Sequence, residues 1–223
     1  MSRFRGFAVG LVAVLALGAL GATGAQAVVL TAKEYPATLD GTGVEGEPTI
    51  FNFEGKEVVC KKTTLSGTLE KESSTVVIGR GYSECTIKLG ESVLPVTIKT
   101  NGCAFELHLE TKLSMDIFQA KVDIVCEGTA GIEFFVYVNE TEHKAGKSLC
   151  VLETPPQKGL ETVELNNMTE AVDVTVTPRV KGITYKRTGS LLCGALNGTA
   201  NYTGSTTMTG TNKNGEFDGL TVK

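Results

Sequence analysis

Hydrophobic and polar residues alternate along most of the chain, most regularly in its middle third. Every second residue is apolar from position 103 to 110, and segments 118–126 and 132–138 repeat the alternation. A strand with one face in a core and the other in solvent has this pattern. Similar runs predict further strands at 28–35, 49–53, 57–61, 75–79, 85–89, 94–100, 162–165, 172–177, 183–186, 200–209 and 216–222.

No stretch of ten residues has the period of an amphipathic helix, so an all-β fold is predicted. Threonine, which suits the exposed face of a strand, is found 28 times after residue 27. Asn101-Gly102 and Asn214-Gly215 lie between alternating runs and predict two-residue hairpin turns. Many short strands joined by short turns indicate a β-sandwich or barrel, and we predict a disulfide-bonded β-sandwich.

The chain could contain two similar, packed halves. Cys60 and Cys103 are 43 residues apart, as are Cys150 and Cys193, and Gly-Lys precedes both Cys60 and Cys150 by a few positions. The polar stretch 139–146 offers a boundary between them. We therefore expect one all-β domain at 28–223, with halves at about 28–140 and 141–223 by this weak repeat.

The first 27 residues have the three parts of a secretion signal. Arg3 and Arg5 precede an apolar run at 8–22, and Ala25-Gln26-Ala27 supplies small residues before a cleavage site. The run is shorter than the roughly 20 residues of a membrane span. We expect a secreted, extracellular protein of bacterial type with no membrane attachment after cleavage.

Charge argues against a nucleic-acid partner. Without the signal segment, 19 basic residues face 25 acidic residues, and the two signs are interspersed. Binding of a polyanion calls for a basic surface instead. The apolar content of 41% is enough for a core.

Six cysteines in an exported chain predict a disulfide framework. Zinc is a poorer explanation, because no C-x-x-C occurs and only two histidines are present. All fifteen possible connectivities stay open, and the sequence offers an argument for two sets of partners. Pairs across hairpins would join Cys60 to Cys85 and Cys103 to Cys126, whereas the repeat would join Cys60 to Cys103 and Cys150 to Cys193.

Common catalytic motifs, including the nucleophile elbow, the zinc-protease helix and phosphate-binding loops, do not occur in the sequence. His108 lies on the polar face of a predicted strand, and His143 lies in a polar loop. The alternate oxygen-bearing residues of 212–218 are better explained by a hairpin than by a calcium loop. We predict no catalytic, cofactor-binding or metal-binding residue.

Several motifs resemble those of a group of exported, six-cysteine, threonine-rich proteins of soil actinobacteria. The resemblance covers nearly the whole chain after the signal segment, and it implies a shared fold but no site residue. Its motifs are Tyr82-x-x-Cys85, Asn101-Gly102-Cys103, the segment from Cys150 through Pro155, Pro156 and Gln157, Val180-x-Gly182-Ile183-x-Tyr185, and Tyr202-x-Gly204-Ser205-Thr206.

The expected function is that of a non-catalytic cell-surface, matrix or adhesion module. Its partner is not identified by the sequence and could be a cell-envelope component, a glycan or a second copy of the chain. Two alternatives remain. A secreted hydrolase would need acids or one histidine gathered in a deep pocket, and a glycan- or small-ligand-binding sandwich would need an apolar or aromatic cleft.

Overall fold

The computed structural model describes residues 27–168 and 173–223, and the predicted all-β fold is confirmed over them. Thirteen strands form one antiparallel sheet, and two strands form a small second sheet. The strands are β1 (Leu30–Ala32), β2 (Ala37–Gly43), β3 (Thr49–Phe53), β4 (Lys56–Leu69), β5 (Thr75–Leu89), β6 (Ser92–Lys99), β7 (Cys103–Lys112), β8 (Ile117–Cys126), β9 (Ile132–Val136), β10 (Cys150–Thr154), β11 (Gln157–Asn167), β12 (Val174–Gly189), β13 (Asn197–Thr203), β14 (Thr206–Thr211) and β15 (Leu220–Val222). A short helix, α1 (Glu140–Lys144), and a 3-10 turn (Leu191–Cys193) complete the described elements.

The large sheet closes on itself. Strands β4, β5 and β12 run its full length, and each of the other positions is filled by two strands in succession: β2 and β3, β6 and β7, β8 and β9, β10 and β11, β13 and β14. Each such strand position pairs with the strand position that comes next along the chain. The last position pairs with the first through β14–β2 and β13–β3. The chain is therefore a closed antiparallel meander.

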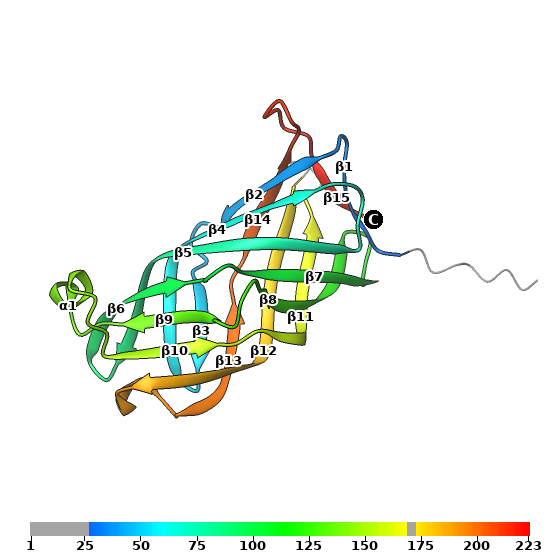
Figure 1. Cartoon of the computed structure of the whole chain (residues 1–223). Coiled ribbons are helices and arrows are strands. Elements are labelled where there is room, and N and C mark those ends of the chain that lie inside the picture. The colour runs from blue at the N-terminus through cyan, green and yellow to red at the C-terminus, as the bar shows by residue number, and fades with distance from the viewer. Residues whose placement is uncertain (1–26, 169–172) are drawn as a thin grey trace, which may run out of the picture.

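Two walls of this closed sheet cross each other. In Figure 1, strands β5, β6, β7, β9 and β10 run across the view, whereas β3, β12 and β13 behind them run upward. Apolar side chains of both walls point inward and interdigitate, as in packed sheets whose strands cross at a large angle. The two packed layers expected of a sandwich are thus opposite walls of one sheet.

A belt of irregular backbone runs around the closed sheet, and we call it the waist. It comprises the connections between the successive strands at 44–48, 100–102, 127–131, 155–156 and 204–205, and a register shift in β12 after Val180. In β4 and β5 two consecutive residues are exposed there, at 61–62 and 83–84, so the inward-facing positions change parity. The waist divides the sheet into a proximal half (β2, β7, β8, β11, β14) and a distal half (β3, β6, β9, β10, β13).

Different elements cover the two ends of the closed sheet. The β1–β15 sheet packs at the proximal end, where Leu30, Leu220 and Val222 are buried. Asn167 holds β15 there, because its side chain both donates to the carbonyl and accepts from the amide of Val222. Helix α1 and the loop 190–196 lie at the distal end (Figure 1).

Aromatic rings fill the distal core. The ring centroid of Phe51 is 4.8 Å from that of Phe134 and 4.6 Å from that of Tyr202. Phe53 contacts Tyr185 at 5.0 Å. The contact of Phe51 with Phe134 joins opposite walls, since β3 carries Phe51 and β9 carries Phe134, whereas Tyr202 is the direct neighbour of Phe51 in the same wall.

One predicted hairpin is wrong. Asn101 and Gly102 have the expected positive φ values of 50° and 74°, and they form a turn. However, β6 and β7 do not pair with each other, since both pair with β5, one after the other. After the turn, the chain continues in the same direction, so that β7 pairs with the proximal part of β5 as β6 pairs with its distal part. Around the second pair the chain does turn back and Thr211 pairs with Phe217, but the tight turn spans Asn212 to Gly215, whose amide donates to the Asn212 carbonyl, and Gly215 rather than Asn214 has a positive φ.

The sequence pattern missed two strands, β2 and β10. In β2 the inward positions after Leu39 are glycines rather than apolar side chains, and in β10 the apolar residues Cys150–Leu152 are consecutive. Both halves of the closed sheet contain strands from before and after residue 140. The predicted signal segment lies outside the described residues except for its last residue, Ala27.

Candidate functional site

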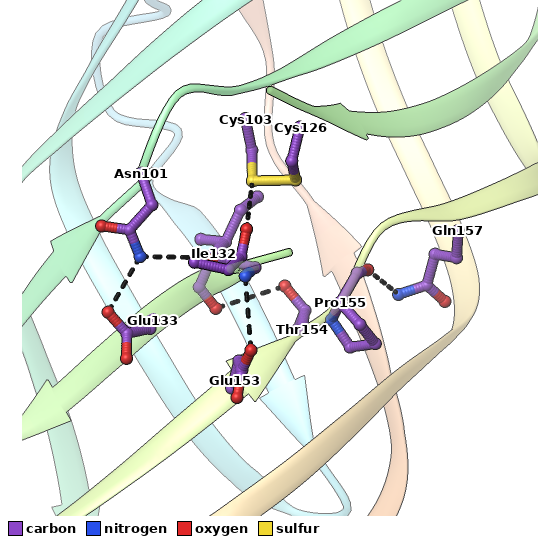
Figure 2. The surroundings of a disulfide bond; sticks show 11 residues. Asn101, Cys103, Cys126, Ile132, Glu133, Glu153, Thr154, Pro155 and Gln157 are labelled. Atoms are coloured by element: carbon purple, nitrogen blue, oxygen red, sulfur yellow. Dashed lines mark hydrogen bonds between the residues drawn. A yellow bond between two sulfur atoms is a disulfide. The ribbon is translucent and has the colours of Figure 1, made fainter. Parts of the chain in front are cut away.

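All six cysteines form disulfides, as predicted, and their partners combine the two open alternatives. Cys60 pairs with Cys85 and Cys103 with Cys126, each across two adjacent strands. The third bond joins Cys150 to Cys193, with a Cα–Cα distance of 6.5 Å. The repeat-based bond from Cys60 to Cys103 is not formed. Figure 2 shows the Cys103–Cys126 bond beside the waist.

His108 belongs to a cluster on the outer face of the proximal half. Glu106 and His108 occupy alternate positions of β7, and Asp123 of β8 is the direct partner of Glu106. Nε2 of His108 lies 3.4 Å from Oδ2 of Asp123 and 4.0 Å from Oε2 of Glu106. The side chain of Asp123 is 11% exposed, whereas those of Glu106 and His108 are 30% and 37% exposed.

Groups outside the cluster hold its ligand atoms in place. Nδ1 of His108 lies 3.5 Å from the hydroxyl oxygen of Thr75, so Nε2 is turned toward the carboxylates. Oδ1 of Asp123 accepts a hydrogen bond of 2.6 Å from the backbone amide of Gly159. Outer contacts of this kind orient the ligands in metal sites.

The Glu106–His108–Asp123 cluster has the composition of a divalent-cation site. One nitrogen and two carboxylate oxygens lie within 4.8 Å of one another. A zinc ion binds such atoms at about 2.0–2.2 Å, and three protein ligands leave one position for water or substrate. The sequence predicted no metal ligand, because Asp123 is fifteen positions from His108. A signal did exist: if Cys103 faces Cys126, the hairpin register places Glu106 opposite Asp123.

His143 lies far along the chain from this cluster and has a packing environment. Its Nε2 is 2.8 Å from the Thr97 hydroxyl, and its ring lies 4.6 Å from that of Tyr137. Nδ1 lies 3.4 Å from a carboxylate oxygen of Glu140, one turn earlier in α1. These contacts fix α1 against the distal half.

A shallow hollow of about 600 Å³ lies on the outer surface at the waist. Its lining combines backbone with both signs of charge, from Gly159, Leu160, Glu161, Thr162, Glu164, Arg179 and Lys181. Gly159 also donates to Asp123, so the hollow borders the cluster. The lining contains no aromatic side chain within the described part of the chain.

The most exposed apolar group is a loop at the distal end, between β12 and β13. Leu191, Leu192 and Leu196 are 80%, 65% and 63% exposed, and we call them the leucine tip. The tip is fixed from below. Cys193 is fully buried in its bond to Cys150, and Nε of Arg187 donates to the carbonyl of Ala195 at 3.3 Å. These leucines were not predicted as a site, because their segment lacks strand periodicity.

Within residues 27–168 and 173–223, helices of the length and hydropathy needed to cross a membrane are absent. Comparison of the chain with protein-family models, with curated protein sequences and with solved structures finds no match.

Proposed function

We propose that the chain is a secreted, non-catalytic extracellular module that binds a protein partner through the leucine tip. Three buried or half-buried disulfides suit an oxidising compartment outside the cell. The observation that carries the proposal is the leucine tip itself. Contiguous exposed apolar side chains on a soluble protein mark sites of interaction.

The tip is rigid, and rigidity favours binding. Three contacts restrain residues 190–196: the Cys150–Cys193 disulfide, the hydrogen bond that the Ser190 amide donates to the carbonyl of Leu149, and the hydrogen bond that Arg187 donates to the carbonyl of Ala195. A preorganised surface loses little conformational entropy when its partner docks. The three leucines are therefore presented to solvent from a restrained loop.

The chemistry of the tip supports an apolar protein surface as its partner. Segment 190–196 contains no charged residue, and its single polar side chain, Ser190, caps the 3-10 turn by accepting from the amide of Leu192. A glycan would require several hydrogen-bonding side chains, and an anionic headgroup would require cations. Neither is present in this segment.

Binding to fractions of the producing cell's envelope and matrix tests the proposal. The chain without its signal segment should be retained by a protease-sensitive component, and a triple Leu191→Ser, Leu192→Ser and Leu196→Ser variant should not. Met115→Ser is the matched control, because Met115 is 81% exposed in a different loop. Equal retention of the triple variant would refute the tip as the contact, and sedimentation velocity would reveal whether the partner is a second copy.

A second candidate function, a metal-dependent secreted hydrolase, is favoured by the Glu106–His108–Asp123 cluster beside the hollow. A bound zinc ion would supply an activated water there. A panel of peptide, ester and glycoside substrates assayed with and without zinc tests it. Turnover that needs zinc and is lost in His108→Gln, but not in His143→Gln, would replace the non-catalytic proposal.

A further inference from the structure

Arg80 lies inside the closed sheet. It projects from β5 on the proximal side of the waist and is only 7% exposed. Its Nη1 donates hydrogen bonds to the hydroxyl of Tyr202 at 2.9 Å and to the hydroxyl of Thr206 at 3.1 Å. Both acceptors are neutral, and the buried Nε has no acceptor among the described residues.

The charge of Arg80 is not balanced by the surrounding protein. Among the ion pairs of the described residues, none includes Arg80. A guanidinium group does not lose its proton in proteins, and an uncompensated buried charge is strongly destabilising. The rings of Phe105 and Tyr202, whose centroids lie 5.7 and 5.8 Å from the guanidinium carbon, offset part of this cost.

A nearby phenol does not supply the missing negative charge. Tyr82 projects from the same strand two residues later, and its hydroxyl is buried. Burial raises the pKa of Tyr82 well above its ordinary value, with a further contribution from Tyr202, while Arg80 opposes the rise. Tyr82 therefore stays protonated at neutral pH and is not a phenolate partner for the cation.

The second buried arginine shows what a satisfied site looks like. Arg187 is 4% exposed, and its Nε and Nη1 donate to the backbone carbonyls of Ala195 and Gly189. Carbonyl oxygens carry the negative ends of backbone dipoles. Arg80 has hydroxyl partners only, together with an empty space that Arg187 does not border.

That space is a cavity of about 10 Å³, lined by Arg80, Tyr202 and apolar side chains of β7, β8, β11 and β12. Because this is the volume open to the centre of a water-sized sphere, the cavity holds one small particle, up to about the size of a halide ion. Among the lining residues only Arg80 and Tyr202 offer a water molecule polar partners, which is at the lower limit of the two to four that a buried water needs. A water would also leave the charge unbalanced.

We propose that this cavity binds one small monovalent anion, of halide size, against the guanidinium group of Arg80. Chloride is the abundant anion that fits. Carboxylates, nitrate and phosphate have several heavy atoms and exceed the available volume. The bound ion would neutralise the cation inside the closed sheet and would link the folded state to halide concentration, because an ion that binds only the folded state stabilises it by mass action.

Two measurements on the folded chain test the proposal. In crystals soaked in sodium bromide, an anomalous peak should lie within hydrogen-bonding distance of the Arg80 guanidinium. In thermal unfolding at constant ionic strength, replacing gluconate with chloride should raise the midpoint in proportion to the logarithm of chloride concentration. Constant ionic strength removes general screening effects.

Three variants test whether the chloride-dependent rise in the unfolding midpoint comes from Arg80 and the cavity. Arg80→Met removes the cation, and Val180→Leu fills the cavity while keeping the cation; both should lose the chloride-dependent rise. Arg179→Met removes an exposed cation and should keep the rise. If Arg80→Met does not fold, Val180→Leu still decides. An anomalous map without a peak in the cavity, or equal midpoints in chloride and gluconate, would overturn the proposal.

Discussion

Asn101 and Glu133 are joined across the waist: Nδ2 of Asn101 donates to Oε2 of Glu133 at 2.8 Å and to the carbonyl of Gly131 at 2.9 Å (Figure 2). The turn between β6 and β7 is thereby tied to the connection between β8 and β9. The next connection, at Thr154 and Pro155, lies against Gly131. The waist is a closely packed belt, although its backbone is irregular.

Replacing Gly131 with alanine should destabilise the fold. An added Cβ would lie 2.1 Å from the carbonyl oxygen of Thr154 and 2.9 Å from Cα of Pro155, and both are backbone atoms that cannot rotate away. We expect a loss of at least about 1–3 kcal/mol in the free energy of unfolding, the usual cost of overpacking. Urea unfolding measures it. Gly128→Ala, in the same connection but with open space around it, should be nearly neutral, and equal effects would contradict the packing argument.

Removing the Cys150–Cys193 disulfide should weaken partner binding as well as lower the stability of the fold, whereas removing another disulfide should lower stability alone. A double substitution to alanine should cost about 2–4 kcal/mol, as for other disulfides, and should also release the leucine tip and weaken retention by the partner. The double substitution at Cys60 and Cys85 should cost a similar free energy but leave retention unchanged. Binding assays below the unfolding midpoint compare the two. Equal retention by both variants would mean that tip rigidity is unimportant.

His108 should control zinc binding if the outer cluster takes a cation. Isothermal titration of the folded chain with zinc should give one site, and His108→Gln or Asp123→Asn should reduce its affinity at least tenfold, the effect of losing a ligand or its support. His143→Gln is the matched control because it removes the other histidine. Loss of zinc binding in the His143 variant alone would disprove this assignment.

Tyr82 should make the fold sensitive to alkaline pH. Its folded-state pKa is raised above 10, mainly by burial, so above pH 10 the unfolded chain loses this proton while the folded chain retains it. Stability is then complete below about pH 10 and falls as the pH rises toward the folded-state pKa. Tyr82→Phe should flatten this part of the pH profile of unfolding and leave stability at pH 7 nearly unchanged, because the hydroxyl has no hydrogen-bond partner among the described residues.

The surface residue Tyr35, which is 39% exposed, provides the comparison for this experiment. Tyr35→Phe should retain the alkaline loss of stability. An unchanged profile in Tyr82→Phe would show that other groups dominate above pH 10.

Local patterning predicted most strands because alternation is a property of neighbouring residues. From Cys103 to Glu110 the inward and outward positions match the observed burial. The closure of the sheet could not be predicted in this way, because β2 pairs with β14 across the length of the chain. The waist was hidden for a related reason. At 61–62 and at 83–84 the alternation of buried and exposed residues is interrupted. In either strand alone this is only a break in the pattern. The break marks the waist only because β4 and β5 pair there, so that the two interruptions lie side by side.

The candidate sites, too, were predictable only where they depend on neighbouring residues in the sequence. Glu106 and His108 were expected on one face of a strand, but Asp123 joins them only through strand pairing. Arg80 follows alternating inward positions, yet a charged residue there was not recognised as buried. The leucine tip depends on the bond from Cys193 to Cys150, which was one of two open alternatives.

Because the meander is closed, the strand at which the chain begins can be changed without changing which strands are neighbours. Val29 and Lys223 exchange two backbone hydrogen bonds of 3.0 Å, so the described ends lie side by side. A short linker from Lys223 to Val28, with new ends opened at Gly146 in the exposed loop after α1, would keep every neighbour in the sheet. Such a circular permutant should fold to the same structure, because the cyclic sequence of strands, rather than their starting point, defines the architecture.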